Sequence, residues 1–218
     1  MTNRVGLAAA ILDRKTAREG DVFVLSLDKL DPRFQSLPRG GMTEITGSRS
    51  SGRTAMVHAI LATATTQGES CALVDCSDAF HPASAADNGV ELDRIFWVRC
   101  QGRPDRALKA ADWILHAGGF GVVLLDLCEV APALLRRIPL SWWYRFRNVI
   151  ENSRTTFLVA ADQHVTGSAA VRVLGMDDAR PVWTGSQLDP LLAGIDMAMA
   201  SRKPSMAEPA RCGVRLAG

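Results

Sequence analysis

Four short apolar runs, separated by stretches of helical periodicity, constrain the fold of this chain more than any other feature. The runs are Met42–Thr46, Cys71–Val74, Gly121–Leu127 and Thr155–Ala161. Apolar runs of this length are typical of central strands in a parallel sheet that helices cover on both faces. We therefore expect these four segments to be the inner strands of such a sheet.

Three stretches between the runs have the spacing of amphipathic helices: Thr54–Thr66, Asp105–His116 and Pro139–Asn152. The second stretch places Ala111 and Ile114 on its inner face. On the same spacing, Arg106, Lys109 and Asp112 face outward. Strands that alternate with helices imply right-handed crossovers. The predicted fold class is α/β, a three-layer domain with a mostly parallel central sheet flanked by helices.

The chain after the fourth run is expected to add two late strands and a helix. Ala169–Leu174 and Val182–Thr184 have the composition of strands, and Asp177 and Asp178 mark a turn between them. The segment Asp189–Ala200 has the composition of a helix. These elements would complete the domain.

Composition divides the chain into three parts. Residues 1–20 form a predicted N-terminal helical segment, and residues 21–200 form the core. Residues 201–218 are rich in Pro, Ser and Gly and hold four basic residues against the single acid Glu208. Such a composition predicts a flexible basic C-terminal tail.

The overall charge and the cysteines exclude several classes of protein. Lys+Arg 25 against Asp+Glu 23 leaves a net charge of +2, and 47% of the residues are hydrophobic. These values exclude collagen-like, disordered and disulfide-framework chains. A near-neutral chain has no bulk field for a polyanion, so contact with DNA would need a local patch. Five cysteines without a CxxC pair favour a reducing cytoplasm and predict no metal site, and no apolar run is long enough for a membrane span.

A glycine-rich segment, GSRSSGRT at residues 47–54, follows the first apolar run and opens the first predicted helix. It fits the phosphate-loop pattern G-x-x-x-x-G-K-[ST] at every defined position except the lysine. In such loops backbone N–H groups and the positive end of the helix dipole hold phosphate, and the hydroxyl of the last residue binds Mg²⁺. Gly47, Gly52, Arg53 and Thr54 are therefore candidate nucleotide-binding residues.

Arg53 occupies the position of the phosphate-loop lysine. Its guanidinium keeps the positive charge but is larger than an ammonium group, so it does not simply replace a point charge in a tight cradle. Two interpretations remain open, weak binding of ATP and Mg²⁺ or a strand-to-helix turn retained for structure. Asp126 ends the third apolar run, where a Mg²⁺-binding carboxylate stands in phosphate-loop proteins, and is a further nucleotide-site candidate.

The chain resembles the core of the RecA-type recombinases over roughly residues 20–200. The matching stretches, in order, are LSLD (25–28), LPRGGMTEITG (37–47), CALVD (71–75), HP (81–82), GVELD (89–93), RAL (106–108), the run 122–126 and the run 157–163. Their order and spacing carry the resemblance more than any single motif does. It implies a RecA-like core of the P-loop NTPase type.

The resemblance also identifies departures that bear on catalysis. In these recombinases a catalytic glutamate follows the second strand, and Ser77 stands at that position here. A serine hydroxyl does not deprotonate water at neutral pH. A family tyrosine that stacks on adenine falls near Ser84, in a segment without aromatic residues. Together with Arg53, these changes predict no catalytic residue and no ATP hydrolysis, and the two loops that bind DNA in the family are shortened.

A RecA-like core without catalysis is similar to the ImuA group of translesion-synthesis accessory proteins. Members of that group are encoded beside the Y-family-related protein ImuB and an error-prone DnaE-type polymerase. The resemblance implies a non-catalytic adaptor in the SOS response, with an ImuB-like protein as partner and RecA or the DnaE-type polymerase as further partners. In the recombinases a helix at the position of residues 1–20 docks on the neighbouring subunit, which implies self-association.

Two other functions remain open at this stage. The first is a divergent RecA-like ATPase of recombination and repair that uses another carboxylate, such as Asp78, as its base. The second is a SulA-type cell-division inhibitor, which also resembles a RecA core without its nucleotide site.

Aromatic and basic residues define the candidate partner-binding surface: Trp142, Trp143, Arg145 and Arg147 in the third helix, and Arg202, Lys203 and Arg211 in the tail. Exposed tryptophan beside arginine is typical of protein-interface hot spots and of base-stacking platforms. A third interpretation is that both tryptophans belong to the core and the arginines are solvated. Partner binding, direct DNA contact and a core role therefore remain alternatives for this helix.

Overall fold

The structure is a computed structural model that describes residues 22–25, 30–31, 34–186, 189–203 and 210–215. The predicted N-terminal helix in residues 1–20 lies outside the described residues. So do residues 204–209 and 216–218 of the predicted tail.

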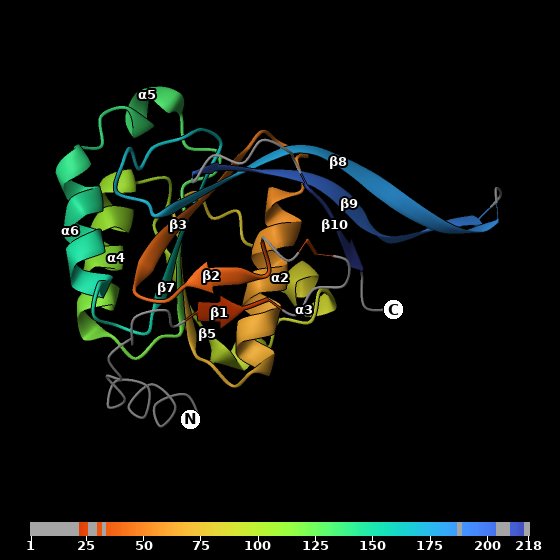
Figure 1. The fold of residues 1–218 in the computed structure, drawn as a ribbon, viewed down its shortest axis with the longest axis horizontal. Helices are drawn as coiled ribbons and strands as arrows, with labels where there is room; N and C mark the ends of the chain where they lie inside the picture. Colours follow the sequence, from red (N-terminus) through yellow and green to blue (C-terminus); the bar gives the residue numbers. More distant parts are fainter. Residues whose placement is uncertain (1–21, 26–29, 32–33, 187–188, 204–209, 216–218) are drawn as a thin grey trace.

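The described chain alternates strands and helices up to β7 and then continues in strands alone (Figure 1). The elements are β1 (Val22–Val24), β2 (Ser36–Pro38), β3 (Gly41–Gly47), α2 (Arg53–Thr66), β4 (Cys71–Asp75), α3 (Pro82–Asp87), η2 (Leu92–Arg94), β5 (Ile95–Arg99), α4 (Pro104–Ala117), β6 (Val122–Asp126), α5 (Pro132–Leu135), α6 (Leu140–Ile150), β7 (Thr156–Ala161), β8 (Arg172–Ser186), β9 (Asp189–Lys203) and β10 (Ala210–Arg215).

An eight-stranded sheet with the order β10-β9-β8-β3-β7-β6-β4-β5 forms the centre of the molecule. The strands from β8 to β5 are parallel, and β9 and β10 add antiparallel pairs at one edge. Helices α4 and α6 cover one face of the sheet, while α2, α3 and the small β1–β2 sheet cover the other (Figure 1). The predicted three-layer α/β fold with a mostly parallel sheet is confirmed.

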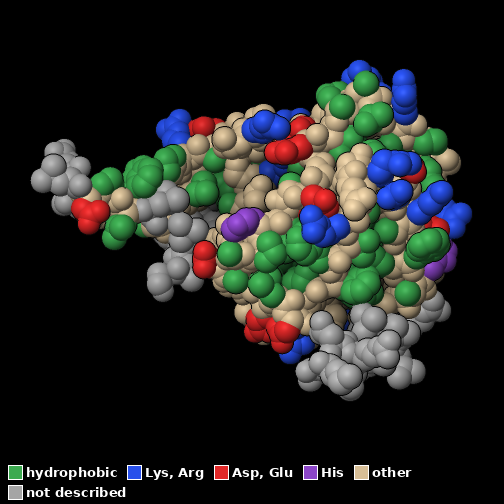
Figure 2. Space-filling model, turned by 180° about the vertical axis from the view of Figure 1, so that it is seen from behind, with side chains coloured by type: hydrophobic (Ala, Val, Ile, Leu, Met, Phe, Trp, Pro, Cys, Tyr) green, Lys and Arg blue, Asp and Glu red, His purple; other side chains and the backbone are tan. Residues whose placement is uncertain are grey.

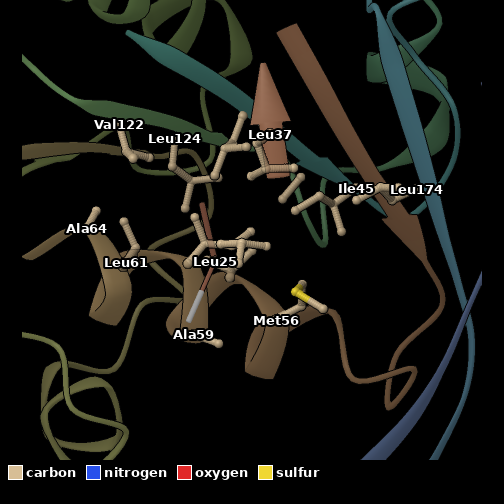
Figure 3. Packing of buried hydrophobic residues seen from close by; sticks show 14 of the residues in the cluster. Leu25, Leu37, Ile45, Met56, Ala59, Leu61, Ala64, Val122, Leu124 and Leu174 are labelled. Atoms are coloured by element: carbon tan, nitrogen blue, oxygen red, sulfur yellow. The ribbon is translucent and has the colours of Figure 1, made fainter. Parts of the chain in front are cut away.

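Side chains of the inner strands alternate between two hydrophobic cores. In β6, Val122 and Leu124 face the α2 side, while Val123 and Leu125 face the α4–α6 side. Figure 3 shows the α2 side, where Met56 and other helix residues pack against strand residues from β3, β6 and β8. Because the strands are buried on both faces, they are continuous apolar runs.

The prediction for residues 169–200 was wrong in two respects. Residues Arg172–Ser186 form one long strand, β8, rather than two strands with a turn at Asp177 and Asp178. Residues Asp189–Lys203 form the strand β9 rather than a helix. From Met197 to Ser201 every second side chain of β9 is buried, with Met197 and Met199 on the core side, and this alternation is the strand pattern that the composition concealed.

The region predicted as a flexible tail also contains strand residues. Ser201–Lys203 end β9, and β10 pairs antiparallel with residues 194–199 of β9. The free edge of β9 supplies the backbone partners that order β10, despite its tail-like composition. The sequence prediction did not include β5 either, which forms the opposite edge of the sheet.

In the described part of the chain, no helix is both long and apolar enough to pass through a bilayer.

Candidate functional site

The phosphate-loop segment forms a tight turn between β3 and α2. Gly52 precedes the helix with φ 87°, in the left-handed region that favours glycine. Gly47 is buried at the end of β3, and a Cβ there would lie 2.6 Å from the carbonyl oxygen of Met176. Thr54 is exposed in the first turn of α2. The loop therefore has the backbone shape that its sequence predicts.

Arg53 turns away from solvent instead of extending along the loop. Its side chain is only 7% exposed, and its Nη1 donates to the carbonyl oxygens of Gly47 and, at 3.2 Å, Ala161. The same nitrogen lies 2.8 Å from Oδ1 of Asp162, an ion pair without hydrogen-bond alignment because both of its protons go to the carbonyls. The guanidinium thus joins the loop to the end of β7, and Asp162 neutralises its charge.

The β8–β9 hairpin closes one side of the loop. A Cβ at Gly52 would collide with the side chain of Met197 and would lie 3.3 Å from the Cβ of Ala179. Met197 is fully buried and belongs to the same core as α2. A residue of the hairpin therefore packs directly against the glycine that allows the turn.

Two carboxylates lie at the carboxyl ends of neighbouring strands, where a magnesium site would be expected. Asp126 accepts a hydrogen bond from the backbone N–H of Cys128 at 2.9 Å, and burial raises the pKa of its carboxyl group. Asp75 accepts from the backbone of Ala79 and Phe80 and from the indole N–H of Trp97. Asp75 therefore already holds the turn after β4, and burial makes the cation-binding anion of Asp126 less favourable than that of an exposed carboxyl group.

The two positions that depart from the family's ATPase site, Ser77 and Ser84, and the alternative base Asp78 are engaged in local bonds. Ser77, at the position of the family's catalytic glutamate, donates to the carbonyl oxygen of Cys128 at 2.8 Å. Asp78 forms an ion pair with Arg99 at 3.3 Å. Ser84 lies in α3, where its backbone N–H donates to His81. Among the described residues, no group of His, Cys, Asp and Glu side chains has the arrangement of a metal site.

The connection after β7 is short and fixed by one buried carboxylate. Glu44 of β3 is fully buried and accepts from the backbone N–H of Val165 and the hydroxyl of Thr166, both at 2.6 Å. Its second oxygen also lies 2.5 Å from Nδ1 of His164. The segment that stands where the family has a second DNA-binding loop is therefore held against the sheet.

Of the alternatives left open for Trp143, the core role is confirmed and the partner-facing role was wrong. Trp143 is fully buried and packs edge-on against Phe146, which lies three residues further along α6. Trp142 is half-buried, with the guanidinium of Arg145 5.8 Å from its ring centroid. The helix turns Trp143 inward because residues 143, 146 and 150 share the face that packs on the sheet.

The other partner candidates differ in their exposure and in the bonds that they already make. Arg147 is exposed. Arg145 donates two hydrogen bonds of 2.7 Å to Asp112, and these bonds raise the pKa of Arg145. Arg202 pairs with Asp177 at 2.9 Å, and Lys203 donates to two backbone carbonyls. Arg211 lies in β10, opposite Ala198 in the register. Asp112 was predicted to face outward and is in fact buried.

The most exposed tryptophan of the described residues was not among the predicted site residues. Trp113 on α4 is 73% exposed. The same helical spacing that places Arg106 and Lys109 outward also places Trp113 outward, so the signal was present.

These features define the class: a three-layer α/β domain with a phosphate-loop turn between its first inner strand and the helix that follows. The family profile "RecA N-terminal domain" matches residues 25–137, more than half of the chain. The chain therefore belongs to the RecA family.

Individual relatives agree with this assignment. "Protein RecA" of Rhodospirillum rubrum is 38% identical over 123 residues, which are 56% of this chain and 32% of that protein. "Protein RecA" of Teredinibacter turnerae is 36% identical and that of Rickettsia massiliae is 32% identical, each over 90 residues, or 41% of this chain and 26% of the relative. The matched regions thus span about a third or less of the length of these relatives.

Proposed function

We propose that this chain is a RecA-family adaptor in DNA-damage-induced (SOS) translesion synthesis that does not hydrolyse ATP. The observation that carries the proposal is the enclosure of Arg53 by Gly47, Ala161 and Asp162. A cation that neutralises phosphate charge must face the phosphate, and this one already has two carbonyls and a carboxylate.

The surrounding groups support the same proposal. ATP hydrolysis needs a base within hydrogen-bond reach of the attacking water. The hydroxyl of Ser77 does not accept a proton from water at neutral pH, and it donates a hydrogen bond to Cys128. The carboxylate of Asp78 is paired with Arg99. The connection between β7 and β8 is short and is hydrogen-bonded to Glu44, so it is not a long loop that could couple nucleotide binding to DNA binding. What remains is a rigid RecA-like body that presents surfaces to partners.

The proposed partners are an ImuB-like protein and, further, RecA or the error-prone DnaE-type polymerase, in the cytoplasm. Trp142, Arg147 and the base of the β8–β9 hairpin with Arg202 remain candidate contact residues, and Trp143 does not. Contact with DNA and association between copies of the chain are secondary proposals that the same binding experiments address.

A second candidate, a divergent ATPase of recombination and repair, is favoured by one observation. The loop keeps Gly52 in the left-handed region and an exposed Thr54 at the start of α2, so the backbone part of a phosphate site persists. The two candidates differ in whether Arg53 leaves Asp162 when nucleotide is present.

Hydrolysis of ATP by the purified chain, with Mg²⁺ and single-stranded DNA, separates these candidates. The adaptor proposal predicts no turnover above background. A rate above about 1 per minute would favour the ATPase, because working enzymes commonly reach about 1 per second or more. An Asp126→Asn variant controls for contamination, since genuine turnover at this site should fall when the carboxylate is removed.

Co-purification with each proposed partner tests the adaptor role itself. The proposal expects the ImuB-like protein to be retained by the chain, and RecA or the DnaE-type polymerase to be retained with it. Retention of the division tubulin homologue instead would select a SulA-type inhibitor.

A further inference from the structure

The outer surface of α4 carries a row of three residues with unusual exposure and charge. Trp113 is 73% exposed, and Lys109 and Arg106 lie four and seven residues before it on the same side of the helix. We call these three residues the α4 stripe. In the space-filling view, Lys and Arg side chains gather with hydrophobic ones over the side of the molecule that carries α4 to α6 (Figure 2).

The helix beneath the stripe is held rigidly. Its inner face, with Ala111 and Ile114, is buried against the sheet. On the side toward α6, Asp112 accepts two hydrogen bonds of 2.7 Å from Arg145. A bidentate guanidinium–carboxylate pair fixes both distance and orientation. The backbone beneath the stripe is therefore preformed, and a partner has to order only the three exposed side chains.

The positive charges of the stripe lack acidic partners within the described residues, whereas nearby acids are already used. Asp105 pairs with Arg103 at 3.1 Å, and Asp112 pairs with Arg145. The described ion pairs include neither Arg106 nor Lys109. The stripe thus combines an uncovered indole with two cations outside the described ion pairs. Tryptophan and arginine are among the residue types that dominate interface hot spots, and Lys109 adds positive charge.

We propose that the α4 stripe binds an acidic segment of a partner protein. An apolar side chain of that segment packs on the indole of Trp113, and its carboxylates reach Lys109 and Arg106. The charge of the stripe selects an acidic occupant, and the exposed indole selects one with an apolar anchor. This inference rests on the proposed adaptor function and names the chemistry of one partner contact.

A protein segment fits this surface better than a single strand of nucleic acid does. Strand-binding proteins combine a basic groove with several aromatic platforms for successive bases. The stripe offers one indole on the convex surface of a helix, and the exposed Tyr144 on α6 is bonded through its hydroxyl to Ser168. The net charge of +2 also supplies no field that attracts a polyanion.

Fluorescence anisotropy of a labelled peptide tests the proposal on the full chain. The probe is a short fluorescein-labelled peptide in which glutamates flank a Phe-Leu pair, and labelled oligothymidine is the nucleic-acid arm. We expect the peptide to bind, and Trp113→Ala and Lys109→Glu each to weaken binding about tenfold or more. A peptide with lysines in place of the glutamates should not bind.

Two control variants are matched to these changes. Arg180→Glu alters the net charge as Lys109→Glu does, but on the β8–β9 hairpin, where Arg180 is exposed. Trp183→Ala removes the tryptophan of the same hairpin, which is 56% exposed. Both should leave peptide affinity within about threefold. Thermal unfolding midpoints equal to the parent's verify that the variants are folded.

Three results would overturn the inference: no peptide binding, equal losses in the control variants, or binding of oligothymidine through Trp113 in place of the peptide. None of these depends on nucleotide. Measurable ATP turnover would remove the adaptor proposal while leaving a positive peptide result intact, so the two failures are distinguishable.

Discussion

The phosphate loop and the α4 stripe use arginine in opposite ways. At the loop, Arg53 is buried and its charge is neutralised by Asp162 and two backbone carbonyls. On the stripe, Arg106 and Lys109 are exposed and have no described acidic partner. The phosphate loop, which carries the family's ligand motif, has its buried cation paired within the protein. The α4 stripe, which carries no motif, has two cations outside the described ion pairs.

This difference indicates where binding should be sought in this RecA-family chain. A cation contributes more binding free energy if the free protein leaves it unpaired, because a paired one must first break its existing bonds. The loop therefore contributes to folding, and the helical surface is available to partners.

The two tryptophans Trp143 and Trp113 should separate stability from binding most clearly. Trp143→Ala is expected to lower the free energy of unfolding by about 3–5 kcal/mol, because it empties a fully buried site. Trp113→Ala should change it by no more than about 0.5 kcal/mol. Urea unfolding followed by circular dichroism measures both.

A conservative variant refines the Trp143 comparison. The indole N–H of Trp143 has no hydrogen-bond partner among the described residues, so Trp143→Phe loses volume but no polar contact. Trp143→Phe should lower the free energy of unfolding by less than half as much as Trp143→Ala does. Equal costs for the two variants would show that the indole N–H makes a bond that this account omits.

Removal of Asp162 should destabilise the fold by about 2 kcal/mol. The side chain of Asp162 is 34% exposed, so solvent screens part of the interaction, but Arg53 would retain a buried charge with only carbonyl partners. The comparison is Asp162→Ala against Asp162→Asn, which keeps a polar acceptor and should cost less. If Asp162→Ala is as stable as the parent, Asp162 does not neutralise Arg53.

His58 should make the α2 side of the fold sensitive to acid. Burial lowers the pKa of His58 below its ordinary value of 6.5. The imidazole of His58 therefore binds a proton more readily in the unfolded chain than in the folded one. The contribution of neutral His58 to the free energy of unfolding is complete above about pH 6.5 and declines as the pH falls toward the folded-state pKa. The slope from one group is at most about 1.4 kcal/mol per pH unit.

Unfolding experiments between neutral and mildly acidic pH check this dependence. The buried His58 packs against Phe80 and lies near Asn88, so a His58→Gln variant keeps a polar partner for Asn88 and removes the titrating group. The parent should lose more stability than the variant as the pH falls. Parallel curves for the two proteins would assign the acid sensitivity to other groups.

The inner strands and the three long helices could be predicted because their signals are local. Continuous apolar runs such as Val122–Asp126 and the face of α4 with Ala111 and Ile114 specify burial by themselves. The strand β9 escaped prediction because its buried residues alternate with alanines, and alanine suits helices as well as strands. Pairing with β8 makes this segment a strand, and the local sequence does not encode that pairing.

The candidate site was predictable as a loop but not as a set of contacts. The motif located Gly52, Arg53 and Thr54, and the structure confirms a strand-to-helix turn there. Two of the three partners of Arg53, Ala161 and Asp162, come from β7 and the residue after it, more than one hundred positions away in the chain. The cover on Gly52 comes from Met197 of β9. Sequence spacing carries no information about such contacts, and the burial of Trp143 was likewise decided by packing.

The central claim is that the phosphate loop no longer receives nucleotide, and thermal unfolding with and without ATP and Mg²⁺ tests it most directly. A ligand present at about a thousand times its Kd stabilises the folded state by about 4 kcal/mol, which raises the unfolding midpoint by several degrees. The account predicts the same midpoint with millimolar ATP and Mg²⁺ as with Mg²⁺ alone. A midpoint that rises with ATP concentration, and that no longer rises in Asp126→Asn, would contradict it.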